Sequence, residues 1–168
     1  MMKRHIENGF TLFELMIVLA IVSILSAVAV PSLRSAFVTS DISSISSDLV
    51  SSLQMARLEA VKRISQTTVK ANGAGENVSW AKGFSISQKI NKDGTYEDTQ
   101  LRNAEATKGT INISSTTNST EVSFDSRGYA NQAHRLEICD SGDSSIEGRR
   151  IVIAASGHVT SEVFNCNS

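Results

Sequence analysis

A run of 21 mostly apolar residues near the N-terminus constrains this chain more than any other feature of its sequence. The run extends from Phe10 to Val30, and Glu14 is the one charged residue inside it. At a rise of about 1.5 Å per residue, a helix of this length reaches roughly 30 Å, which is the thickness of the hydrocarbon core of a bilayer. We therefore expect residues 10–30 to form a transmembrane helix.

A short polar segment, residues 1–9, precedes this run and carries Lys3 and Arg4. Positive charges in front of a membrane span favour a cytoplasmic N-terminus. Everything after Pro31 is then expected to lie outside the cytoplasm.

A cleavable secretory signal is the alternative reading of the same segment. The tripeptide Ala27-Val28-Ala29 has the small-x-small form of a signal-peptidase site. Two observations weigh against it. The carboxylate of Glu14 costs at least ~2.5 kcal/mol inside lipid and so needs a function there. The helical pattern also continues beyond Val30.

Beyond Pro31 the apolar residues recur at spacings of three and four, which predicts an amphipathic helix. We expect residues 31–66 to be the second half of one long helix that joins the anchor to a head, with Asp41 as a candidate local cap. The apolar stripe consists of Ile42, Ile45, Leu49, Leu53, Ala56, Ala60 and Ile64.

Residues 67–168 change in character, because short runs of β-rich composition alternate with turn residues. This pattern predicts an α+β fold in which the helix packs on one or two antiparallel sheets. Residues Asn103–Lys108 and Ser115–Ser119 are expected to be exposed loops, and Trp80 is expected in the packing of the head. The expected strands are Thr67–Lys70, Gly83–Lys89, Thr110–Ser114, Glu121–Phe124, Arg135–Cys139, Arg149–Ala155 and His158–Val163.

The segment from Gly9 to Leu15, G-F-T-L-F-E-L, resembles the signature of type IV prepilins. This resemblance implies the type IV pilin fold, cleavage between Gly9 and Phe10 by a prepilin peptidase, and N-methylation of Phe10. It also implies that Glu14 pairs with the freed α-amino group of a neighbouring subunit and sets the axial register. A glutamate that snorkels to the headgroups is the alternative. Pro31 lies where pilins often carry a helix-kinking proline.

Four further segments resemble the GspH/FimT/FimU group of pilin-like proteins. The resemblance favours a FimU-like minor pilin that helps to initiate assembly and forms part of the pilus tip complex, with roles in twitching motility and adhesion. A GspH-like pseudopilin of type II secretion and a FimT-like DNA-binding minor pilin are the alternatives. The segments are Leu49–Arg63, Phe124–Gly128, Leu136–Cys139 and Arg149–His158.

This group membership also implies partners and a location. The expected partners are other minor pilins, the major pilin, the prepilin peptidase/N-methyltransferase and an assembly platform in the inner membrane. The expected location is the bacterial inner membrane, with one span and a periplasmic head, and then the tip of the fibre.

The chain has two cysteines, Cys139 and Cys166, both after the apolar run. An even number in an exported protein predicts one disulfide, here between the C-terminal tail and an upstream element. Two unrelated buried thiols are the alternative.

Nucleic-acid binding is not expected, because the formal net charge is −1. FimT-like members use a Gly-Arg-x-Arg element, whereas the corresponding stretch here reads Gly157-His158-Val159-Thr160. Arg149 and Arg150 are expected to form a structural pair on a solvated face. No catalytic motif, metal-ligand spacing or cofactor fingerprint is found in the sequence, so we expect neither an enzyme nor a cofactor or metal site.

Overall fold

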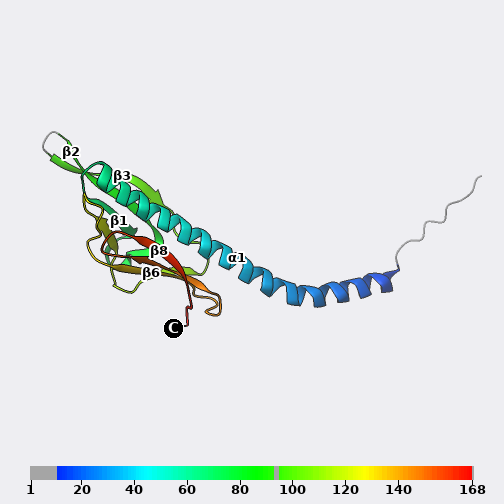
Figure 1. Ribbon diagram of the computed structural model, residues 1–168. Helices are drawn as coiled ribbons and strands as arrows, with labels where there is room; N and C mark the ends of the chain where they lie inside the picture. The colour runs from blue at the N-terminus through cyan, green and yellow to red at the C-terminus, as the bar shows by residue number, and fades with distance from the viewer. Residues whose placement is uncertain (1–10, 93–94, 168) are drawn as a thin grey trace, which may run out of the picture. The chain divides into compact units, whose positions relative to one another are not determined.

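The computed structural model describes residues 11–92 and 95–167, and in this part of the chain one long helix precedes eight strands (Figure 1). Helix α1 spans Leu12–Lys62 and a short 3-10 helix spans Gly75–Asn77. The chain divides into two compact units after Phe37. The strands are β1 Thr67–Asn72, β2 Ser79–Lys92, β3 Thr95–Ala104, β4 Ile111–Ser115, β5 Glu121–Phe124, β6 His134–Asp140, β7 Gly148–Ile153 and β8 Val159–Phe164.

The first unit is the apolar part of α1. This helix is long and apolar enough to cross a membrane, and none of its most apolar 18-residue window is buried inside the structure. Ser23 and Ser26 fit the apolar surroundings because each hydroxyl donates to a carbonyl of the preceding turn, at 2.7 and 2.8 Å. The helix is assigned without interruption through Pro31. A kink at Pro31 stays a prediction.

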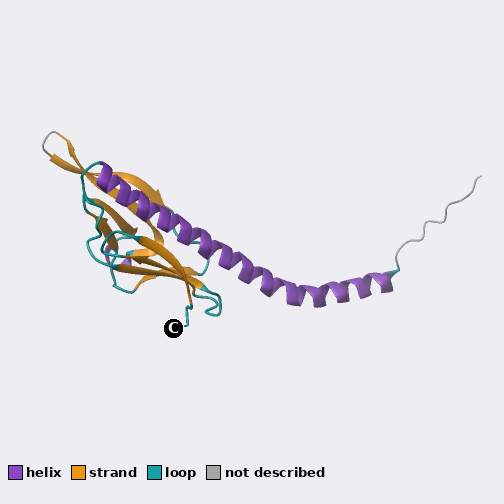
Figure 2. Cartoon of the chain, viewed as in Figure 1, coloured by secondary structure: helices purple, strands orange, loops and turns teal. Residues whose placement is uncertain are grey.

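The second unit contains the rest of α1 and two four-stranded antiparallel sheets (Figure 2). The first sheet has the strand order β3-β2-β1-β5, and the second has the order β4-β6-β7-β8. Side chains along β6 alternate between buried and less buried positions, with Leu136 and Ile138 fully buried. This alternation is the period-2 pattern of a strand with one face on a core. The prediction of a helix packed on antiparallel sheet is confirmed.

The apolar stripe of α1 closes the core between helix and sheets. Its members pack with strand residues such as Val69, Ile86, Phe124 and Ile151. Burial of a side chain such as Leu53 contributes about 1.5–3 kcal/mol, so the stripe is a main source of stability for this unit. The stripe residues that are buried are Ile42, Leu49, Leu53, Ala56 and Ala60, and Ile45 packs beside them partly buried.

The helix differs from the prediction at its end. It terminates at Lys62 rather than at residue 66, and it runs through Asp41, which is therefore no cap. Ile64 does not belong to the stripe: it has a positive φ of 50° and is 80% exposed. A spacing of four made it look like one more turn, but a residue in the left-handed region cannot continue a right-handed helix.

Each predicted strand is present, although the ends of most differ by a few residues, and Ser115, which was expected in a loop, ends β4. Strand β3 was not expected, and Asn103 and Ala104, which were expected in a loop, form its end. The sequence of β3 is polar and carries several charges, so it lacks the apolar alternation that marks a half-buried strand. Pairing with β2 from Lys92↔Thr95 to Phe84↔Ala104 forms this strand instead.

Candidate functional site

The prepilin-like motif lies at the start of α1, and the structure describes part of it. Gly9 and Phe10, the expected cleavage and methylation residues, lie outside the described residues. Thr11 is the residue before the helix, and its side-chain Oγ1 accepts a hydrogen bond from the backbone N–H of Glu14 at 3.2 Å. This is half of a capping box, in which a Thr N-cap satisfies the N–H three residues on.

The Thr-x-x-Glu spacing in the motif could have predicted this cap from the sequence, and we missed it. Glu14 lies in the first turn of α1, where a negative charge interacts favourably with the helix dipole. Its side chain is exposed. Glu14 thus has a local structural role in addition to any role in assembly.

The surface that follows the motif is apolar along its whole length. More than half of the surface of large side chains such as Leu15, Leu19 and Ile24 is exposed. Because every described side chain in the apolar window is exposed, this part of α1 presents a long apolar surface of the kind that marks a contact with a membrane or with another protein.

Arg57 connects the second half of α1 to two turns of the head. Its Nε donates to the carbonyl of Gly128 at 3.0 Å, and its Nη2 donates to the carbonyl of Ser156 at 3.2 Å. Gly128 and Gly157 have positive φ values of 82° and 80°. A Cβ on Gly157 would lie 1.9 Å from the Gly128 carbonyl oxygen, so glycine is required at this close approach.

The disulfide joins Cys139, on β6, to Cys166, which follows the end of β8 in the sequence. The two Cα atoms are 5.9 Å apart. The disulfide passes over Gly148 at the start of β7. A Cβ at Gly148 would lie 2.5 Å from the Cys166 sulfur and 2.4 Å from the Ile138 carbonyl oxygen. The disulfide therefore fixes the C-terminal tail to the second sheet and leaves room only for glycine beneath it.

Strand β7 carries the basic residues Arg149 and Arg150, and the side chain of Arg150 forms ion pairs with the two neighbouring strands. This guanidinium lies 2.9 Å from a carboxylate oxygen of Glu137 on β6 and 3.7 Å from one of Glu162 on β8. It also stacks over the ring of Phe164, 3.9 Å from the centroid. Arg150 is thus paired with two acids, which leaves little positive charge to bind phosphate.

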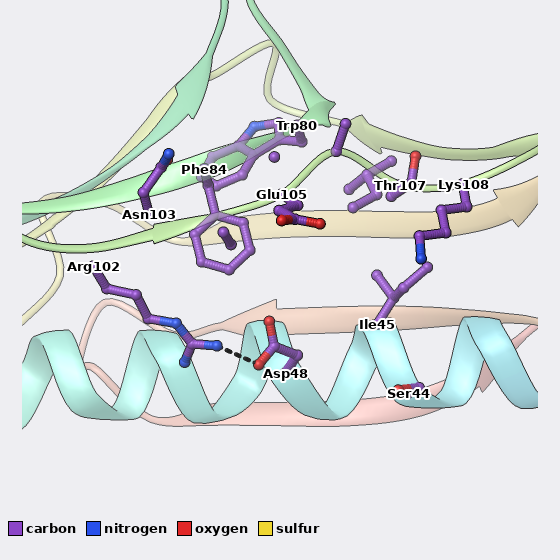
Figure 3. Close-up of a pocket in the computed structure, with 14 residues that line it drawn as sticks. Ser44, Ile45, Asp48, Trp80, Phe84, Arg102, Asn103, Glu105, Thr107 and Lys108 are labelled. Atoms are coloured by element: carbon purple, nitrogen blue, oxygen red, sulfur yellow. Dashed lines mark hydrogen bonds and ion pairs between the residues drawn. The ribbon is translucent and has the colours of Figure 1, made fainter.

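A cavity of about 450 Å³ lies between α1, β2 and β3, and Figure 3 shows the side chains that line it. Trp80 and Phe84 line it with ring centroids 6.4 Å apart, and the indole N–H of Trp80 donates to the carbonyl of Ser119 at 2.9 Å. An ion pair between Arg102 and Asp48, with N and O 2.6 Å apart, lies beside it. Both aromatic rings are buried, so Trp80 belongs to the packing of the head, as predicted.

The titratable side chains of His134 and Asp125 in the head both have shifted pKa values. Burial lowers the pKa of the His134 imidazole, whose Nε2 bonds to the Asn131 side-chain oxygen at 3.0 Å and whose Nδ1 has no partner among the described residues. The pKa of the Asp125 carboxyl is lowered first by the backbone N–H of Tyr129 and then by the side chain of Arg127. Among residues 11–92 and 95–167, no cluster of three His, Cys, Asp or Glu side chains could hold a metal ion.

Two family models match this chain. The model of the type II transport protein GspH matches residues 46–157, which is about two thirds of the chain, and the model of the prokaryotic N-terminal methylation motif matches residues 4–30. The comparison with curated proteins found no matching relative.

Solved structures resemble the fold. A crystal structure of the type IV minor pilin FimU of Pseudomonas aeruginosa aligns with 23% identity and a TM-score of 0.60, over 73% of this chain and 89% of that one. The minor pseudopilin EpsH of the Vibrio cholerae type 2 secretion system aligns with 14% identity and a TM-score of 0.54, over 70% of this chain and 92% of that one. The expected type IV pilin fold is thereby confirmed.

Proposed function

Because this chain belongs to the family of the type II transport protein GspH, we propose that it is a minor pilin of a type IV pilus. It is inserted in the bacterial inner membrane through α1, with its head in the periplasm, and it then joins the tip region of the fibre with other minor pilins and the major pilin. There it helps to initiate assembly. The family consists of structural subunits rather than known enzymes.

One observation supports this proposal above the others. A helix that carries the methylation motif at its start leaves its apolar side chains uncovered, while the same helix closes the core of a folded head. A soluble binding protein would gain nothing from such a surface, since exposed apolar helix favours aggregation. A subunit that moves from a membrane into a helix-cored fibre needs both halves.

Processing at the N-terminus is part of the proposal. Prepilin peptidase cuts between Gly9 and Phe10 and the new amine of Phe10 is methylated. Glu14 then pairs with the amine of a neighbouring subunit, because a carboxylate in apolar surroundings is costly unless an opposite charge meets it. A kink at Pro31 lets the two halves of α1 adjust to different neighbours.

The test replaces Glu14 with alanine in the full chain, expressed in cells that lack the native copy. Loss of the gene should reduce surface fibres and twitching, and the Glu14→Ala copy should fail to restore them. Ser26→Ala is the matched control, since its hydroxyl bonds only to its own helix. Full restoration by Glu14→Ala would refute the assembly role of Glu14. An intact protein mass that begins at Met1 or Val30 would refute the processing.

A pseudopilin of type II secretion is the second candidate, favoured by the description of the matching family and by the similarity to EpsH. We place it second because the aligned identity is 14% with EpsH and 23% with FimU. The two candidates differ in phenotype. A pseudopilin mutant would lose protein export and keep its pili, and a minor pilin mutant would show the reverse.

A further inference from the structure

Strand β8 is an edge of the second sheet. Strand β7 pairs with it on one side, and no strand among the described residues pairs with it on the other. Its six residues extend over roughly 20 Å, and the four central ones, 160–163, are exposed. An open edge of this length presents a row of backbone groups that another strand can bind.

The backbone groups on the open edge of β8 can be identified from the hairpin that joins β7 to β8. The N–H of Ala154 donates to the carbonyl of His158 at 2.9 Å, and bonded pairs alternate with non-bonded pairs along an antiparallel ladder. Every second residue of β8 therefore faces away from β7. Each of these residues offers one N–H and one C=O, and these groups have no partner in the part of the chain that the structure describes. They are Val159, Ser161 and Val163.

The other three edge strands are protected against such pairing, whereas β8 is not. Strands β4 and β5 have only five and four residues, and the edge of β5 is already bonded, because the N–H of Asn131 donates to the carbonyl of Ser123 at 2.9 Å. Strand β3 is longer but carries Glu97, Asp98 and Arg102, and charged side chains discourage pairing at an edge. Strand β8 has no Lys, Arg or Pro, and three of its six residues are Val or Thr.

The direction of β8 restricts which strand can pair with it. Gly157, just before β8, lies close to Arg57 of α1, since a Cβ on this glycine would meet Arg57 Nε at 2.9 Å. Further along, the hydroxyl of Ser161 lies 2.8 Å from that of Ser46. Strand β8 therefore runs opposite to α1. Two copies of this chain in one membrane would point their α1 helices, and hence their β8 strands, in the same direction, so β8 cannot pair antiparallel with β8 of a second copy there.

The side chains of β8 indicate what the pairing strand carries. Glu162 is the one charged residue of β8, and its side chain is 57% exposed. Its carboxylate lies 3.7 Å from the Arg150 guanidinium, which is closer to Glu137, at 2.9 Å. Opposite charges that face each other across two strands stabilise the pair, and like charges destabilise it. A basic side chain opposite Glu162 therefore fits this edge, and an acidic one does not.

We propose that β8 is a docking edge for one extended segment of another fibre subunit. This segment adds to the second sheet as a fifth strand, antiparallel to β8, and carries a lysine or arginine opposite Glu162. The backbone groups of the open edge supply the affinity, and the side chains of the two strands supply the choice of partner. This inference rests on the proposed function as a fibre subunit.

The main test places proline at position 163 of the full chain, in cells that assemble fibres and lack the native copy. Because the N–H of Val163 faces the open edge, Val163→Pro removes a donor from that edge and leaves the ladder with β7 intact. The matched control is Val163→Ala, which shortens the same side chain and keeps the N–H. We expect Val163→Pro to enter fibres about tenfold less than Val163→Ala, since an edge hydrogen bond is lost and the ring obstructs the pairing strand. Formation of the disulfide and protease resistance of the head in membranes check that both variants fold.

A photo-crosslinking residue identifies the occupant. At position 160, exposed in the middle of β8, it should give an adduct in the sheared fibre fraction. The second peptide of this adduct should contain Lys or Arg and come from the head of another subunit. Gln100, exposed on the edge strand β3, is the control position and should not give that peptide.

A pair of substitutions tests the charge. Glu162→Lys should enter fibres less than Glu162→Gln, because two positive charges opposite each other across a strand pair repel. Equal incorporation of these two variants would overturn the basic partner residue.

Equal incorporation of Val163→Pro and Val163→Ala would overturn the edge proposal and leave the proposed function intact. An adduct with lipid, with β8 of a second copy or with the N-terminal helix of another subunit would do the same, as would no adduct in fibres that contain the chain. If the unsubstituted chain is absent from the fibres, both proposals fall.

Discussion

The two halves of α1 differ in what surrounds their apolar side chains, although they belong to one helix. Leu19 in the first half is 60% exposed, whereas Leu53 in the second half is completely buried against the sheets. The first half is apolar on all sides and the second is apolar on one side. The difference shows that the second half buries its apolar side chains in a core formed by its own chain. The apolar side chains of the first half have no such core.

The largest expected effect tests this contrast directly. Leu53→Ala should lower the free energy of unfolding of the head by about 2–5 kcal/mol, because it leaves a cavity in a closed core. Leu19→Ala, the same chemical change in the other half, should leave that free energy unchanged. Denaturant unfolding of the full chain in detergent, followed by the fluorescence of Trp80, measures both. An equal loss of unfolding free energy in the two variants would contradict the contrast between the two halves of α1.

The second test concerns the disulfide, a constraint that only the head possesses. Cys166→Ser should lower the free energy of unfolding by about 3 kcal/mol, since the unfolded chain regains the freedom of the loop between the cysteines. Gly148→Ala should produce a smaller loss and slow the formation of the disulfide, because its Cβ would approach the Cys166 sulfur.

Alanine at Gly109 is the control for Gly148. A Cβ at Gly109 would meet no atom within 4 Å, although its φ of 67° adds some backbone strain. Disulfide formation at the wild-type rate in Gly148→Ala would contradict the close packing inferred here. The rate can be followed by trapping free thiols during refolding.

Much of this difference between the halves could be predicted from the sequence. The uniform apolar run and the spaced stripe from Ile42 to Ala60 distinguish an open helix from a packed one. The contacts of Arg57 with Gly128 and Ser156 could not be predicted, because 71 and 99 residues separate the partners and no local rule brings them together.

The prediction failed where long-range pairing competes with local composition. Strand β3 is polar and is formed by its pairing with β2, and Ile64 fits the stripe in spacing but lies beyond the last turn. Gly148 carried no signal that the disulfide would pass over it. The site at the N-terminus was visible because a motif is local by definition, although the cap of Thr11 was missed.

The third test measures how the stability of the head depends on pH, through the buried side chain of His134. Burial lowers the pKa of His134, so the unfolded chain, with an ordinary histidine pKa near 6.5, binds a proton more readily than the folded one. Stability should therefore be full above about pH 6.5 and should decline as the pH falls below that value. One proton on one group makes this effect smaller than that of the disulfide.

The control for this pH test is His134→Gln, which should flatten the dependence between about pH 5 and 7, the range in which histidine titrates. Unfolding midpoints across a pH series provide the measurement. An unchanged slope in His134→Gln would assign the proton to another group.

The smallest effect compares two acidic residues of α1, one in each half. Asp48 pairs with Arg102 of β3, but both side chains are more than one third exposed, so water and salt screen the interaction. Asp48→Asn should cost less than about 1 kcal/mol of head stability, and the loss should shrink in high salt. Glu14→Gln should cost nothing in the same assay, because Glu14 belongs to the other compact unit of the chain. If Glu14→Gln destabilised the head as much as Asp48→Asn, the stability of the head would depend on a residue in the first half of α1. The division of α1 into an open half and a closed half would then be wrong.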